Sequence, residues 1–166
     1  MEKLKLYQYH KNFPKKFDQE KKKISKAIGN YGIYHIGSTA VEGLGGKGII
    51  DIMIGVNNWE EAKDIAKKLK KIGFKHVHRK IEKGELFLSK HQKATLDNVH
   101  IHIAKKESKV YQDLFSFRDY LRKNKKEAQE YFRLKTEALA KAKGSRVRYN
   151  KLKARYIETV LKKIKN

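Results

Sequence analysis

Residues 34–53, YHIGSTAVEGLGGKGIIDIM, contain the side chains of this sequence that are best suited to chemistry. The turn Gly37-Ser38-Thr39 combines small residues with two hydroxyl groups, and Lys47 adds a positive charge further along the same loop. Glycine places no Cβ between a backbone N–H group and an anion, so such a turn can hold a phosphate. The G-x-x-x-x-G-K-[ST] spacing of a Walker motif is absent, so a plain connecting loop is the other interpretation.

A single carboxylate, Asp51, interrupts the apolar run IIDIMIGV at residues 49–56. This composition predicts a central strand that is covered on both faces. An ionised carboxylate is costly to bury unless it is paired or binds a cation. No neighbour within the run can pair with Asp51, so its partner must be a metal ion, Lys47 or an arginine such as Arg118. A buried salt bridge and a functional carboxylate at a strand end are the two interpretations.

Two histidines lie close together in NVHIHIA at residues 98–104, where apolar and polar residues alternate strictly. The alternation predicts a strand with its apolar residues on one face and His100 and His102 on the other. Neutral imidazoles so placed can bind a divalent cation, and one of them can act as a general base. The other interpretation is a structural polar network that joins both histidines to Asp51 and His35.

Positive charge dominates the composition, with 41 Lys and Arg residues against 18 Asp and Glu residues and a formal net charge of +23. Such an excess attracts polyanions such as RNA, although a lysine-rich bias on solvated helices gives the same totals. No apolar run approaches the roughly 20 residues that cross a bilayer, and the first residues lack the apolar segment of a signal peptide. The chain has no cysteine, which excludes disulfides and thiolate metal sites. We expect a cytoplasmic protein with no membrane partner.

The predicted elements are helices and strands in an order typical of α+β proteins. We expect one domain, residues 1–166, with a mixed sheet and flanking helices within about residues 1–105 and C-terminal helices over about 108–166. In one of these helices, Lys135 falls on the apolar side with Tyr131 and Leu139. The expected helices cover residues 12–29, 58–73, 108–122, 125–143 and 150–164, and the expected strands cover 31–36, 49–56, 74–81, 85–92 and 98–104.

The run HIGSTAVEGLGGKGIIDI resembles the signature of the GrpB family, His-Ile-Gly-Ser-Thr-Ser-Val-Pro-Gly-Leu, a short spacer, and Lys-Pro-Ile-Ile-Asp-Ile. Later segments fit the same family: HIHI on a strand, FRDYLRKN at 117–124, YFRLK at 131–135, and Tyr149 followed by Lys153. The resemblance covers nearly the whole chain. It implies a nucleotidyltransferase-like α+β fold.

In the nucleotidyltransferase superfamily, a Gly-Ser turn holds a triphosphate, and carboxylates on neighbouring strands bind two Mg²⁺ ions. The resemblance therefore implies a nucleotide-dependent transferase with a nucleoside triphosphate as its substrate. The residues expected to bind the nucleotide are Gly37, Ser38, Thr39, Lys47 and Arg118. For Arg118, an ion pair with the neighbouring Asp119 is the alternative role.

Asp51 and His102 are the expected catalytic residues, and Asp51, His100 and His102 are the expected ligands of a divalent cation. Met53 stands where the superfamily has its second carboxylate. Imidazoles with one carboxylate suit Mn²⁺ or Zn²⁺ better than Mg²⁺, which prefers oxygen ligands. The alternative function is a catalytically inactive module of the same fold that binds RNA or a nucleotide through its basic surface.

Overall fold

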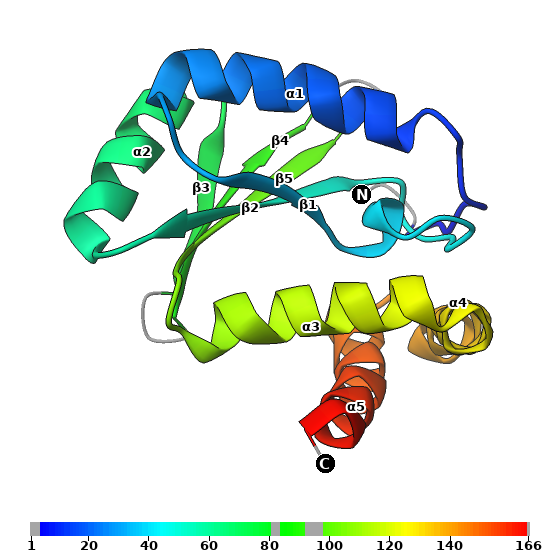
Figure 1. Ribbon diagram of the computed structural model, residues 1–166. Helices are drawn as coiled ribbons and strands as arrows, with labels where there is room; N and C mark the ends of the chain where they lie inside the picture. The colour runs from blue at the N-terminus through cyan, green and yellow to red at the C-terminus, as the bar shows by residue number, and fades with distance from the viewer. Residues whose placement is uncertain (1–3, 81–83, 92–97, 166) are drawn as a thin grey trace.

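A computed structural model describes residues 4–80, 84–91 and 98–165 (Figure 1). Ile81 and Gln92, the last residues of two predicted strands, lie outside the described residues. In chain order the elements are α1 (Phe13–Ile28), β1 (Ile33–Ile36), the short 3₁₀ helix η1 (Ser38–Ala40), β2 (Ile50–Val56), α2 (Trp59–Lys71), β3 (Lys75–Lys80), β4 (Glu85–Lys90), β5 (Val99–Lys105), α3 (Lys109–Lys123), α4 (Lys125–Ala142) and α5 (Arg146–Lys165).

The described strands form one mixed five-stranded sheet in the order β1-β2-β5-β4-β3. β2 and β5 run parallel at its centre, and the other neighbouring pairs are antiparallel. Figure 1 shows α1 and α2 over one face of the sheet and α3 along the other, with α4 and α5 next to α3. The predicted α+β architecture with a mixed sheet is therefore confirmed.

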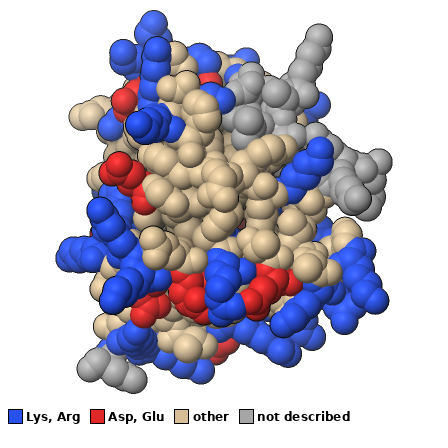
Figure 2. Space-filling view, turned by 90° about the vertical axis from the view of Figure 1, so that its right-hand side faces the viewer, with Lys and Arg blue, Asp and Glu red and all other residues tan. Residues whose placement is uncertain are grey.

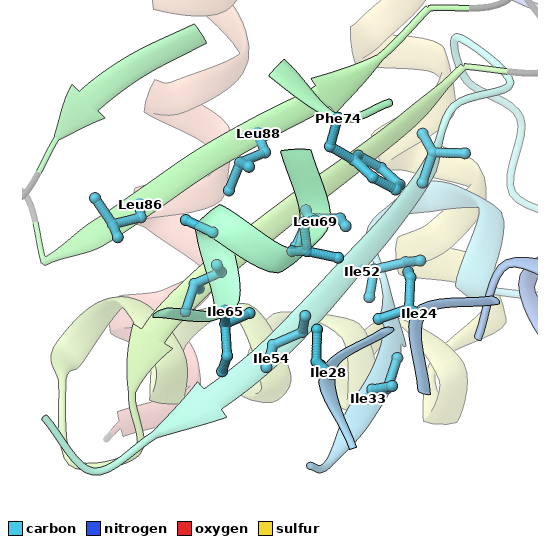
Figure 3. Packing of buried hydrophobic residues seen from close by; sticks show 14 of the residues in the cluster. Ile24, Ile28, Ile33, Ile52, Ile54, Ile65, Leu69, Phe74, Leu86 and Leu88 are labelled. Atoms are coloured by element: carbon cyan, nitrogen blue, oxygen red, sulfur yellow. The ribbon is translucent and has the colours of Figure 1, made fainter. Parts of the chain in front are cut away.

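Alternation along β2 divides its side chains between two environments. Ile52 and Ile54 are fully buried and pack against isoleucines and leucines of α1 and α2 (Figure 3). Burying such a side chain stabilises the fold by roughly 1.5–3 kcal/mol. Asp51 and Met53 alternate with them and so point to the face that α3 covers. The main core therefore anchors β2 on one side and leaves the other side for polar groups.

The last helix begins earlier than predicted, at Arg146 rather than at residue 150. Ser145 follows Gly144, and its hydroxyl oxygen accepts a hydrogen bond from the backbone N–H of Arg148 over 3.3 Å. This is the contact of an N-cap, which satisfies a backbone donor that the first turn of a helix leaves free. The correction places Tyr149 in the first turn of α5, where it faces inward with an exposed fraction of 1%.

None of the helices in the described part of the chain is both long enough and apolar enough to cross a membrane.

Candidate functional site

A cavity of about 110 Å³ lies beside Asp51, between the central strands and the C-terminal helices. Of the predicted site residues, Ser38, Thr39, Lys47, Asp51 and His100 line it. Tertiary packing thus brings together the glycine-rich turn, the lone carboxylate and a strand histidine. The lining is completed by Gly48, Ile49, Tyr131, Lys135, Tyr149 and Lys153.

Asp51 and the two histidines lie on adjacent strands because the parallel register pairs Asp51 with His100 and Met53 with His102. The Oδ1 atom of Asp51 is 3.3 Å from Nδ1 of His100 and 3.9 Å from Nε2 of His102. Burial alone would raise the pKa of the Asp51 carboxyl, but the favourable interactions with the nearby His100 and His102 rings outweigh it and hold the pKa well below its usual range. Asp51 is therefore an ionised carboxylate at neutral pH.

His102 lies between two carboxylates, and the second one, Glu85, was missed by the sequence analysis. Nδ1 of His102 is 2.7 Å from Oε2 of Glu85, while Nε2 faces Asp51. Burial alone would lower the pKa of His102, but the nearby Asp51 carboxylate and the hydrogen-bonded Glu85 raise it to about 9. His102 is thus an imidazolium at neutral pH, and it has no free nitrogen to serve as the predicted general base.

The same arrangement does not fit the divalent cation predicted at Asp51, His100 and His102. An imidazole must be neutral to bind a metal, whereas both nitrogens of His102 face carboxylates. Met53, in the place of a second acid, is fully buried against Ile36 and Ala104. In the described ranges no group of three or more His, Asp or Glu side chains is placed to hold a metal. Binding of a divalent cation at Asp51, His100 and His102 stays a prediction, and the arrangement of these side chains does not favour it.

Three lysines face the cavity from three separate segments: Lys47 from the loop before β2, Lys135 from α4 and Lys153 from α5. The ammonium group of Lys135 donates hydrogen bonds to the Oγ atom of Ser38, over 2.8 Å, and to the carbonyl oxygen of Gly45. The Nζ atoms of Lys47 and Lys153 lie 4.8 Å and 5.9 Å from the centre of the Tyr149 ring.

Burial lowers the pKa of all three ammonium groups, and repulsion from Lys153 adds to the effect at Lys47 and Lys135. Burial, with repulsion from Lys153, lowers the pKa of Lys47 to about 8 and that of Lys135 to about 7. Burial also lowers the pKa of Lys153. Within the residues that the structure describes, no ion pair joins any of the three to a carboxylate. The site is thus a cluster of three desolvated amino groups, with one ionised carboxylate, Asp51, lining the same cavity to attract them.

Only Lys47 of these lysines was predicted as a site residue from the sequence. Two features of the sequence could have identified Lys135 and Lys153 as site residues. Both lie in segments that resemble the GrpB family, and Lys135 also lies on the apolar side of its predicted helix. The exposed fraction of Lys135 is 3%. Burial of a charged group to this extent is costly, so it indicates a specific role.

The hydroxyl groups of Ser38 and Thr39 in the turn have different hydrogen-bond partners. The Thr39 hydroxyl donates to the carbonyl oxygen of Ile49 over 3.0 Å. It therefore accepts the 2.9 Å hydrogen bond from Nε2 of His35, whose pKa burial lowers to about 4, so that the ring is neutral. Thr39 thus fixes the turn to the start of β2. Ser38, in contrast, accepts a hydrogen bond from Lys135 and can donate its own hydrogen into the cavity.

Gly37 allows the turn to pass close to the carboxylate. Its φ is +74°, and a Cβ atom at this position would lie 2.5 Å from Oδ2 of Asp51. Only glycine fits both the backbone conformation and the space. The predicted importance of Gly37 therefore has a steric basis in this structure.

Arg118 does not line the cavity. Its guanidinium group lies 2.7 Å from Oδ1 of Asp119 and donates a 3.0 Å hydrogen bond to the carbonyl oxygen of His35. Nε of Arg122, one turn later on α3, donates to the carbonyl oxygen of Ala40 over 2.8 Å. These two arginines bracket the Gly37–Ala40 turn, so α3 positions the turn from outside the cavity.

Comparison with known proteins gives a family and a fold. The family model described as GrpB protein matches residues 3–163. The chain is 32% identical to the Glutamate-rich protein GrpB of Alkalihalophilus pseudofirmus, over 94% of this chain and 92% of that one. It is 29% identical to the UPF0157 protein BH1888 of Halalkalibacterium halodurans, over 95% and 80% of the two chains.

Among solved structures, the crystal structure of GrpB from Enterococcus faecalis matches with a TM-score of 0.83 and 24% identity, over 96% of both chains. A structure of the Cid1 poly(U) polymerase with MgGTP bound matches with a TM-score of 0.52 and 12% identity, over 79% of this chain and 44% of that one. At these identities the two structures show the fold alone. The predicted nucleotidyltransferase-like fold is confirmed by them.

Proposed function

Since the chain belongs to the GrpB family, we propose that it is a nucleotide-dependent transferase whose cavity beside Asp51 holds the phosphates of a nucleoside triphosphate. One observation carries this proposal: three lysines, none of them in an ion pair with a carboxylate among the described residues, share a cavity with Ser38 and the ionised Asp51. Clustered ammonium groups in a site that is partly closed to water bind phosphate oxygens strongly.

In a nucleotidyl transfer, the lysines and Asp51 would have different roles. The oxygen of an acceptor hydroxyl forms a bond to the α-phosphorus while the bond to pyrophosphate breaks, and the hydroxyl proton passes to solvent water. Lys47, Lys135 and Lys153 balance the charge on the departing pyrophosphate. Asp51 is a weak base because its pKa is well below the usual range. Its role is therefore to accept a hydrogen bond from the acceptor hydroxyl and to orient it.

Binding and turnover of ATP test the proposal. We expect Lys153→Met to weaken ATP binding by about 10-fold or more, since a hydrogen bond to a charged group contributes roughly 1.5–3 kcal/mol. Lys151→Met, at an exposed position on the same helix, is the matched control and should bind ATP like the wild type. Asp51→Asn should retain ATP binding and lose transfer of labelled nucleotide to acceptors.

Two results would oppose the proposal. One is ATP binding that is equal in the wild type and in Lys153→Met. The other is no transfer by the wild type with any nucleoside triphosphate, with or without Mg²⁺ or Mn²⁺, across a panel of acceptor hydroxyl compounds.

The second candidate is a catalytically inactive module that binds RNA or another polyanion through its surface. The imidazolium at His102 and the buried Met53 favour it, because they leave Asp51 as the lone carboxylate on the cavity wall. On the face in Figure 2, however, Lys and Arg side chains form separate groups with Asp and Glu among them. A steep fall of RNA affinity with salt would support this candidate, and no binding at low salt would remove it.

A further inference from the structure

We infer that the cavity takes its triphosphate as a free polyanion, with lysines in the place of divalent cations. The ligand class is an uncomplexed chain of phosphates, carried by a nucleotide or present as inorganic triphosphate. This inference rests on the proposed function and deepens it, because it concerns the form in which the ligand enters the same cavity.

The first argument is the number of protein oxygens available to a cation. Asp51 is the lone carboxylate among the described residues that line the cavity. Its Oδ1 atom faces His100 and His102, at 3.3 Å and 3.9 Å. Its Oδ2 atom packs against Gly37, where even a methyl group would approach to 2.5 Å. A divalent cation bound with the phosphates uses one or two carboxylates from the protein. Here a single carboxylate faces the cavity, and the two histidines already compete for its Oδ1 atom.

The second argument is the charge that the cavity already contains. Lys47, Lys135 and Lys153 converge on it from a loop and two helices. Mg²⁺ ions in transferase sites neutralise the phosphate oxygens, and three ammonium groups perform the same task here. A divalent cation placed among them would be repelled by like charges at short range. Burial strengthens this repulsion, since it lowers the effective dielectric constant around Lys135, which is 3% exposed.

The third argument is geometric, and it concerns which part of a nucleotide enters. The cavity is partly open to solvent, and its charged lining consists of Lys47, Lys135, Lys153 and Asp51. Phosphate groups can therefore enter it while the sugar and base extend toward solvent. Ser38 and the lysines offer hydrogen bonds that suit phosphate oxygens. We therefore expect the cavity to select for the length and charge of the phosphate chain, with little discrimination among bases.

Calorimetric titration of the full chain tests the inference with three probes: ATP, inorganic triphosphate and adenosine. In EDTA we expect ATP and inorganic triphosphate to bind with similar affinity and adenosine not to bind. Saturating Mg²⁺ should weaken the binding of ATP and of inorganic triphosphate by about 10-fold. The complexed phosphates carry less negative charge, so the lysines attract them less. GTP should match ATP.

Variants test whether inorganic triphosphate binds in the cavity. Lys47→Met should weaken binding of inorganic triphosphate in EDTA by about 10-fold or more, while the exposed control Lys151→Met leaves it unchanged. Circular dichroism and a melting curve show whether each variant is folded. If Lys47→Met does not fold, Lys47→Gln replaces it, since glutamine keeps a polar end and loses the charge.

The outcomes separate the inference from the proposed function. ATP binding that requires Mg²⁺, or that becomes tighter with it, overturns the inference and leaves the proposed function in place. No binding of ATP or inorganic triphosphate in either condition overturns both. Binding of inorganic triphosphate without any nucleotide transfer supports the inference and counts against the transferase.

Discussion

His102 shows how neighbouring carboxylates assign a charge state that the residue type alone does not reveal. A histidine on a strand is a candidate base or metal ligand, yet here both of its ring nitrogens face carboxylates, Glu85 at 2.7 Å and Asp51 at 3.9 Å. The pair of carboxylates makes the imidazolium the stable form. Without it, the two buried negative charges would lie close together with no cation between them.

This charge state makes a prediction for His102→Asn. The pKa of His102 is about 9 in the folded protein against an ordinary value of about 6.5. A raised folded pKa means that the contribution to stability is complete below pH 6.5 and is lost as pH rises through 9. The shift corresponds to roughly 3 kcal/mol. Urea unfolding should show a gap between wild type and variant that is larger at pH 6 than at pH 9.5 by about that amount, and a gap independent of pH would contradict it.

Gly37 permits a second prediction at the same scale, with Gly43 as its matched control. Both have positive φ, +74° and +78°, but an added Cβ meets Asp51 at 2.5 Å in one case and nothing within 4 Å in the other. Gly43→Ala should therefore cost roughly 1–3 kcal/mol of backbone strain. Gly37→Ala should cost more, because it must also displace Asp51 from its histidines, and it should abolish triphosphate binding. Chemical denaturation and calorimetry measure the two effects, and equal behaviour of both variants would contradict the steric role.

At the scale of elements, the site depends on helices that are distant in sequence from the turn. α3 holds the turn through Arg118 and Arg122, which donate to the carbonyl oxygens of His35 and Ala40. α4 and α5 bring Lys135 and Lys153 to the opposite wall of the cavity. The sheet supplies Asp51 and the histidines from its two central parallel strands.

Arg118 variants distinguish positioning from phosphate binding. Arg118→Met and Arg118→Lys should both lower the free energy of unfolding by roughly 1–3 kcal/mol, because lysine cannot reproduce the fork that binds Asp119 and the His35 carbonyl together. Triphosphate affinity should fall modestly and to a similar extent in both. Affinity that survives in the lysine variant and is lost in the methionine variant would instead support the phosphate clamp that we predicted from the sequence.

For the molecule as a whole, the net charge of +23 is the dominant property. Such a charge opposes the compact state through self-repulsion, and salt screens it. Many of the ion pairs are exposed helix pairs such as Lys68 with Asp64, which contribute little.

The melting temperature should therefore rise as NaCl is increased from low to physiological ionic strength. Differential scanning calorimetry without any ligand measures this, and chloride replaced by acetate controls for anion binding in the cavity. A melting temperature that falls with salt would show that ion pairs outweigh self-repulsion.

By itself, the sequence determined the elements and the parts of the site that are close in the chain. The apolar run at residues 49–56 and the alternation along residues 98–104 depend on neighbouring residues. So does the recognition of a glycine turn before the strand that carries Asp51. These patterns predicted most element bounds and the α+β fold. The exception was the start of the last helix, where the cap at Ser145 was overlooked.

Only the tertiary structure decided which candidate site residues meet and which charge each of them carries. The imidazolium at His102 depends on antiparallel pairing of β4 with β5, which brings Glu85 to it from a segment that the local pattern does not connect with it. The cation cluster depends on the packing of α4 and α5 against the turn, which joins Lys135 to Ser38 across most of the chain. Burial then sets the charge states, and burial depends on every element that surrounds the cavity. Register and packing are long-range properties, so no local pattern could reveal them.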